Sequence, residues 1–221
     1  MPLPRTLEPE VMDEADDAID YDRMDHYAVN ARFISDLLDF APTLPNPILD
    51  VGTGTALIPV ELLRRLPSAV VLGIDAATSM IDLARANVER AGFAESITLE
   101  VFDARNLPYV EGDWPCVISN SIIHHIPEPL EVLAEMTRLL TPGGLLFVRD
   151  LARPDTTEAV DAIVETYAKS EADHARRLFH DSLHAALTLE EIRAMVVTLG
   201  YAAATVTMTS DRHWTWAARG I

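Results

Sequence analysis

The sequence predicts an α/β protein in which a mostly parallel, seven-stranded sheet is covered by helices on both faces. The main observation is that short apolar runs alternate with segments of helical spacing from residue 48 onward, as in parallel sheets with crossover helices. A second observation is a C-terminal hairpin signal, where apolar residues alternate on either side of Ser210-Asp211. A chain of 221 residues, 49% of them hydrophobic, suits a single domain with a full core.

The first half of the chain supplies these elements in a regular order. A helix is predicted over residues 27–40, where Val29, Phe33 and Leu37 recur at helical spacing. Prolines at 42, 45 and 47 end it. The alternation continues with strands at 48–51, 69–74 and 97–102 and with helices at 56–66 and 79–91.

The second half continues the alternation and then departs from it. Strands are expected at 116–120 and 145–149 around a helix at 129–140, with Pro142-Gly143-Gly144 as the turn before the second strand. Two helices follow, at 156–170 and 172–186. Thr188 and Glu191 form a capping-box pattern for a helix that ends at Gly200. The closing hairpin starts near Ala203 and carries two tryptophans on one face, a pattern that favours core packing.

Composition and charge exclude several classes of partner. Thirty-five acidic residues against 17 basic ones give a net charge of -18, which repels nucleic acid and anionic membrane surfaces. No apolar run is long enough to span a bilayer, and the N-terminus has no signal-peptide core. A single cysteine, Cys116, cannot form an internal disulfide. Together these features predict a cytoplasmic protein that binds neither nucleic acid nor membrane.

The most informative segment is the run Ile48-Leu-Asp-Val-Gly-Thr-Gly-Thr-Ala56. Its strand leads into two glycines and then directly into a helix, a turn that lets the backbone approach a ligand closely. Asp75 ends the next strand, 21 residues past Gly54, where an acid can accept hydrogen bonds from ribose hydroxyls. Leu57 replaces the third glycine of the dinucleotide pattern, and the anionic Asp50 suits a ligand with a cationic group.

At this point the sequence resembles the class I S-adenosylmethionine-dependent methyltransferases, and within them the small-molecule branch typified by quinone biosynthesis. The resemblance covers residues 48–150 and implies a Rossmann-like three-layer sandwich. Five segments carry it in the family's order: Leu49-Asp-Val-Gly-Thr-Gly-Thr55, Gly73-Ile-Asp75, Val101-Phe-Asp-Ala104, Ser119-Asn-Ser-Ile-Ile-His-His-Ile-Pro127 and Leu140-Thr-Pro-Gly-Gly-Leu-Leu-Phe147. One departure is Ala56, where many members have a third glycine; alanine still permits close helix packing.

The resemblance implies S-adenosyl-L-methionine as the cofactor, S-adenosyl-L-homocysteine as its product, and a small molecule as methyl acceptor. It places the methionine moiety at Asp50 and the glycine turn, the ribose at Asp75, the adenine at Met80 and the sulfonium near Asn120. The full set of implied cofactor contacts is Asp50, Gly52, Thr53, Gly54, Asp75, Ala76, Met80, Asp103, Ala104, Asn120 and Ser121.

Methyl transfer from a sulfonium is an in-line displacement, so the protein mainly aligns the acceptor and excludes water. A base is needed only when the acceptor must lose a proton, and His124 and His125 are the candidates because they follow the strand beside the glycine turn. One of the two can instead be structural. Asp150 is the third candidate, to orient a histidine, bind acceptor or cap the following segment. Arg149 and Arg153 are expected to pair with surplus acids rather than with an anionic acceptor.

Two regions lie outside the shared motifs. Residues 1–45 are predicted to form an N-terminal helical cap in which Tyr21 and His26 face the pocket. Residues 151–187 are predicted to be a helical insertion that serves as a lid or as a dimer contact, and a homodimer is therefore possible. His180 and His184 have a spacing that can chelate zinc, but the pair lacks an HExxH pattern or a cysteine partner, so no metal is assigned.

Two other functions remain open beside methyl transfer. A protein that binds S-adenosylmethionine without turnover, as a regulatory or scaffold subunit, would need the same cofactor motifs. An NAD-dependent oxidoreductase is disfavoured by Leu57 and by the absence of a Tyr-x-x-x-Lys pair.

Overall fold

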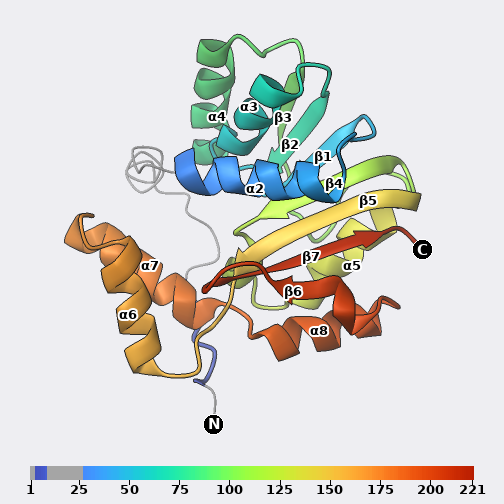
Figure 1. Cartoon of the computed structure of the whole chain (residues 1–221). Coiled ribbons are helices and arrows are strands. Elements are labelled where there is room, and N and C mark those ends of the chain that lie inside the picture. The colour runs from blue at the N-terminus through green and yellow to red at the C-terminus, as the bar shows by residue number, and fades with distance from the viewer. Residues whose placement is uncertain (1–2, 9–26) are drawn as a thin grey trace.

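The computed structural model describes residues 3–8 and 27–221, and its centre is one seven-stranded sheet (Figure 1). The strand order is β3-β2-β1-β4-β5-β7-β6, parallel except for β7, which runs antiparallel to both of its neighbours. The predicted fold class is therefore confirmed. The strands are β1 (Ile48–Val51), β2 (Val71–Asp75), β3 (Ile97–Val101), β4 (Trp114–Asn120), β5 (Leu140–Leu151), β6 (Val206–Met208) and β7 (His213–Arg219).

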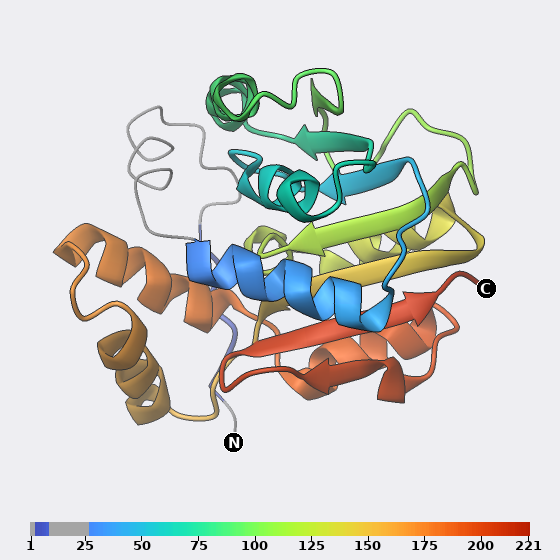
Figure 2. The same cartoon turned by 45° about the horizontal axis from the view of Figure 1, so that its top comes forward.

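Helices cover both faces of the sheet, as the alternation predicted (Figure 2). One face is packed by α2 (Tyr27–Phe40), α3 (Leu57–Arg65) and α4 (Thr78–Ala91). The other face is packed by α5 (Pro129–Leu139) and α8 (Leu189–Thr198). Each helix turns an apolar stripe toward the sheet, and burying those stripes is the main stabilising contribution. The described residues include no helix that is both long and apolar enough to cross a membrane.

The order of the strands reverses at β1, which pairs with β2 on one side and β4 on the other. The Ser119 hydroxyl on β4 donates a hydrogen bond of 2.8 Å to the Val51 carbonyl at the end of β1. The carboxyl ends of parallel strands meet at one edge of a sheet, and a reversal of strand order there is where open α/β sheets bind their ligands. The glycine turn and the segment after β4 both lie there.

The segment Pro142-Gly143-Gly144 corrects one boundary of the prediction. It lies inside β5, which begins at Leu140 and not at residue 145. The pairing of β4 with β5 shifts register between Trp114 and Cys116, and Gly143 has a φ of 75°. The extra residues are therefore absorbed as an irregularity in a continuing strand.

The C-terminal part matches its pattern closely. The Thr188–Glu191 capping box is present at the start of α8, and Trp214 and Trp216 on β7 are fully buried. The predicted start of the last hairpin near Ala203 is a short 3-10 turn, η2 (Ala203–Thr205), and β6 begins at Val206.

Between β5 and α8 the chain forms two helices, α6 (Thr157–Tyr167) and α7 (Asp173–Ala185). They pack on each other around Val160, Val164 and Leu183, in a small core separate from those of the sheet. The pair lies off the carboxyl edge of the sheet, and α7 contacts the 3-10 turn η1 (Ile123–His125) that follows β4 (Figure 1).

Candidate functional site

The glycine turn after β1 has the geometry that a ligand cradle requires. Gly52 and Gly54 have φ values of 73° and 54°, in the left-handed region that favours glycine. A Cβ on Gly52 would lie 2.1 Å from Ile122 Cγ2, whereas a Cβ on Gly54 would meet nothing within 4 Å. The first glycine is therefore required by packing, and the second borders open space.

A buried polar contact supports the turn from behind. Asn87, on the buried face of α4, donates a hydrogen bond of 3.0 Å to the Thr55 carbonyl. The sequence analysis missed this residue, although a polar side chain at a core position of the helix was a visible signal.

Asp50 lies beneath the turn with only 2% of its surface exposed. Its carboxylate accepts a hydrogen bond of 2.7 Å from the Thr53 hydroxyl. Burial raises the pKa of Asp50 to about 7, and the nearby charge of Asp75 adds to the shift against the hydrogen bond from Thr53. A cationic ligand group beside it would stabilise the ionised form.

Asp75 stands at the carboxyl end of β2, as predicted. Its two carboxylate oxygens accept hydrogen bonds from the Gly54 amide at 2.9 Å and the Ala77 amide at 3.0 Å. Burial raises the pKa of Asp75, although these amides and the His125 side chain act in the opposite direction. The two amides fix the carboxylate beside the glycine turn, with lone pairs left for further donors.

The last residue of β4 and the residue that follows it form the sulfonium side of the predicted site. Asn120 donates a hydrogen bond of 3.0 Å to the Ser121 hydroxyl, while its side-chain oxygen is buried without a hydrogen-bond partner among the described residues. Ser121 has a φ of 60°, which is uncommon for a residue with a side chain. An unpaired buried acceptor is costly, and a bound donor would satisfy it.

The predicted contacts on the adenine side differ in how far they are buried. Met80 is buried in a small cluster with Ala77 and Leu83, apart from the two main cores. Asp103 is half-exposed and forms an ion pair of 2.6 Å with Arg105, so a ligand amino group would have to share its carboxylate. Two smaller residues of this set, Ala76 and Ala104, are exposed and partly buried respectively.

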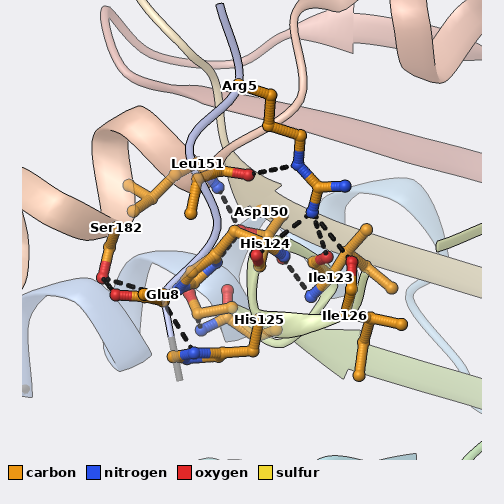
Figure 3. A network of polar contacts seen from close by, with 12 residues as sticks. Arg5, Glu8, Ile123, His124, His125, Ile126, Asp150, Leu151 and Ser182 are labelled. Atoms are coloured by element: carbon orange, nitrogen blue, oxygen red, sulfur yellow. Dashed lines mark hydrogen bonds and ion pairs between the residues drawn. The ribbon is translucent and has the colours of Figure 1, made fainter. Parts of the chain in front are cut away.

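The three catalytic candidates meet at η1 (Figure 3). Asp150, at the end of β5, is 1% exposed and contacts the Nδ1 of His124 at 2.5 Å. Its other carboxylate oxygen accepts the backbone amides of Ile123 at 2.5 Å and His124 at 3.3 Å. Asp150 therefore orients His124 and accepts the backbone amides of η1, and it also accepts the amide of Leu151, which follows it in the chain.

Each member of this pair shifts the pKa of the other. Burial disfavours the charged form of each, but their mutual attraction and hydrogen bond outweigh it, so the pKa of His124 is raised and the pKa of Asp150 is lowered. Glu8 adds to the effect on His124, because its carboxylate lies 3.5 Å from the Nε2 atom.

Glu8 belongs to the segment 3–8, which we call the N-terminal strap. Its carboxylate also lies 3.0 Å from the Nδ1 of His125 and accepts the Ser182 hydroxyl of α7. The Arg5 guanidinium donates to carbonyl oxygens of η1 and α7, including Ala185 at 2.6 Å. Sequence analysis missed both strap residues, because their partners lie more than a hundred positions away and no local pattern indicates the contact.

The remaining candidates have separate outcomes. Arg149 pairs with Asp36 at 2.6 Å and Arg153 pairs with Glu191 at 2.6 Å, which confirms that they meet acidic side chains. The predicted cap residues Tyr21 and His26 lie outside the described residues.

The strand order, the glycine turn and the two flanking acids agree with the fold and site expected of the class I methyltransferases, which the five segments resemble. Residues 48–144 match a family model described as a methyltransferase domain, so the recognition is confirmed over this segment. A demethylmenaquinone methyltransferase from Deinococcus radiodurans is 37% identical over 111 residues, which cover 50% of this chain and 45% of the relative. The chain spans about half the length of the curated relatives it matches.

Solved structures agree on the fold. A SAM-dependent methyltransferase from Aquifex aeolicus superposes with a TM-score of 0.72 at 15% identity, covering 94% of this chain and 99% of the other. The cyclase SpnF also superposes, with a TM-score of 0.59 at 17% identity over 90% of this chain and 84% of its own. Fold likeness at this identity therefore does not assign the reaction.

Proposed function

We propose that this protein transfers a methyl group from S-adenosylmethionine to a small-molecule acceptor. The observation that carries the proposal is a pair of carboxylates, the buried Asp50 and the partly buried Asp75, on either side of a turn that borders open space at Gly54. Asp50 suits the cationic ammonium of the methionine moiety, and Asp75 suits the ribose hydroxyls. The unpaired oxygen of Asn120 offers a further acceptor at the same edge of the sheet. These features fit the cofactor.

S-adenosylmethionine would supply a methyl group already activated on a sulfonium. The chain then has to align the acceptor and keep water away. His124 is the proposed proton acceptor, with Asp150 holding its Nδ1 so that Nε2 faces the N-terminal strap. His125, also on η1, is the second candidate for acceptor contact. We also propose a cytoplasmic location, because the chain is strongly acidic and its one cysteine is buried.

Two measurements, made one after the other, test the proposal. S-adenosylhomocysteine should raise the melting temperature of the protein, whereas NAD should not, because a ligand that binds the native state stabilises it. A panel of small acceptors should then release S-adenosylhomocysteine from S-adenosylmethionine. Stabilisation without turnover across quinols, phenols, thiols and carboxylic acids would contradict methyl transfer.

Cofactor affinity is expected to depend on pH through Asp50. Below about pH 7 its carboxyl is protonated and loses the charge that faces the ammonium. The affinity for S-adenosylhomocysteine should therefore fall as the pH drops, by about tenfold between pH 8 and pH 6. Calorimetric titrations across this range check the slope.

The matched variant is Asp50→Asn, whose affinity for S-adenosylhomocysteine should be weaker and nearly independent of pH in this range.

The pH dependence of folding stability through Asp50 has the opposite sign to that of cofactor affinity. A carboxyl whose folded pKa lies above its unfolded value binds more protons in the native state between about pH 4 and pH 7, so Asp50 lowers stability as pH rises there. An affinity that stays flat in the wild type would contradict the role of Asp50.

The helices α6 and α7 are proposed as a lid over the acceptor, with a dimer contact as the alternative. Replacing residues 155–186 with a short Gly/Ser linker should keep S-adenosylhomocysteine binding but abolish methyl transfer, because shielding is lost and the strap loses Ser182 and Ala185. Light scattering on both proteins tests the alternative. Normal turnover combined with loss of a dimer would overturn the lid in favour of the dimer contact.

A further inference from the structure

Glu8, His124 and His125 bring three metal-ligand atoms together at the carboxyl edge of the sheet. One carboxylate oxygen and two ring nitrogens lie within 4.8 Å of one another (Figure 3). Among the described residues this is the one such group of three. The residues come from two segments that are far apart in sequence, the N-terminal strap and η1, so the cluster is a product of the tertiary structure.

The ligand atoms are turned toward one another before any ion is present. Asp150 holds the Nδ1 of His124, which leaves Nε2 directed at Glu8. A carboxylate on the far nitrogen of a histidine is the usual outer partner of a metal-bound imidazole, because it fixes the ring and raises its basicity. The Ser182 hydroxyl fixes the position of the Glu8 carboxylate, with contacts of 3.2 Å to both of its oxygens.

The contacts inside the cluster are electrostatic rather than well-formed hydrogen bonds. The Nδ1 atom of His125 is buried and lies 3.0 Å from Glu8, yet it forms no hydrogen bond of acceptable geometry with a described residue. The distance from Glu8 to the Nε2 of His124 is 3.5 Å, beyond an ordinary hydrogen bond. Both separations suit atoms that share an ion at about 2.0–2.2 Å from each.

The strap that carries Glu8 is firmly attached. Its Thr6 amide donates to the His184 carbonyl at 3.1 Å, and Arg5 donates to the His124 carbonyl at 3.1 Å and the Ile126 carbonyl at 2.9 Å. The side chain of Glu8 is only 8% exposed as a result. Ordering of the ligands, which normally costs binding free energy, is therefore already complete.

We propose that Glu8, His124 and His125 form a binding site for a divalent transition metal of the zinc class. Two imidazoles and one carboxylate suit zinc, whereas magnesium and calcium prefer oxygen ligands alone. Three protein ligands leave a fourth position for water or for a group of the acceptor. The consequence for catalysis rests on the proposed function. A bound ion occupies the nitrogen that would accept a proton, so the metal inhibits methyl transfer to acceptors that must be deprotonated.

The test uses the full-length, untagged chain, freed of metal by a chelator and titrated with Zn²⁺ alone near neutral pH. We expect one Zn²⁺ per chain. Glu8→Gln and His125→Gln should each weaken the affinity for Zn²⁺ by at least about tenfold, and Ser182→Ala should weaken it by less. Co²⁺ should give visible absorption typical of nitrogen and oxygen ligands, whereas Mg²⁺ should show no binding.

The matched control is the double variant His180→Gln and His184→Gln, which removes a pair of neighbouring histidines on α7 with ring centroids 4.7 Å apart. It should bind Zn²⁺ as the wild type does. Zinc binding that is absent, that survives Glu8→Gln unchanged, or that is lost in the control would overturn the proposal. Because the titration contains no cofactor, a failure to bind S-adenosylhomocysteine would count against the proposed function and leave the metal site standing.

Discussion

Replacing Asp75 with alanine is expected to weaken S-adenosylhomocysteine binding by about tenfold or more while the fold stays intact. The carboxylate can accept charge-assisted hydrogen bonds from two ribose hydroxyls, and the loss of such bonds costs roughly 1.5–3 kcal/mol. The variant also removes the acceptor of the Gly54 amide, which shapes the open side of the turn. Isothermal titration calorimetry measures the dissociation constant directly.

Asp82→Ala is the matched control for Asp75→Ala. Asp82 is an exposed acid on α4 whose partner in the structure is Arg85, so its removal changes the net charge equally without touching the turn. Its affinity should equal that of the wild type. An unchanged dissociation constant for Asp75→Ala, or an equal loss in both variants, would contradict the ribose assignment.

The elements of the fold could be predicted because their signals are local. Helical spacing placed α2 at its observed bounds, and the capping box at Thr188 marked the start of α8. The alternation of β7 correctly predicted that Trp214 and Trp216 are core residues. The error at Pro142-Gly143-Gly144 arose because these residues mark a backbone irregularity, and only pairing with β4 decides whether the strand ends there.

The site could be predicted only where its residues lie in sequence motifs at the ends of neighbouring strands. The glycine turn and Asp75 are placed by adjoining strands, and their register brings Val51 beside Ile74. In contrast, Asp150 had three possible roles in the sequence, and the choice required the distance to His124. The contact of Glu8 with both histidines depends on how the N-terminal strap packs between η1 and α7, which neither motif nor periodicity encodes.

Asp150→Asn is expected to reduce methyl transfer by at least about a hundredfold for an acceptor that must lose a proton. Asparagine keeps the size of the side chain but offers one acceptor oxygen in place of two. In the wild type, one carboxylate oxygen of Asp150 accepts the amides of η1, and the other contacts the Nδ1 of His124 and accepts the Leu151 amide. If the asparagine oxygen stays on the amides of η1, its NH₂ group takes the second position and faces Nδ1 and the Leu151 amide. Donation to Nδ1 would place the ring proton on Nε2, so that His124 could no longer accept a proton there.

The readouts for Asp150→Asn separate a positioning role from loss of structure. We expect kcat to fall while KM for S-adenosylmethionine and the affinity for S-adenosylhomocysteine change little, because Asp150 contacts neither the glycine turn nor Asp75. The unpaired Leu151 amide should lower the free energy of unfolding by about 1–3 kcal/mol, which urea denaturation measures. Asp36→Asn is the control, since it breaks the ion pair with Arg149, the residue before Asp150 on β5, without reaching His124. A kcat that Asp150→Asn leaves unchanged, or that Asp36→Asn lowers equally, would show that His124 does not act as a proton acceptor oriented by Asp150.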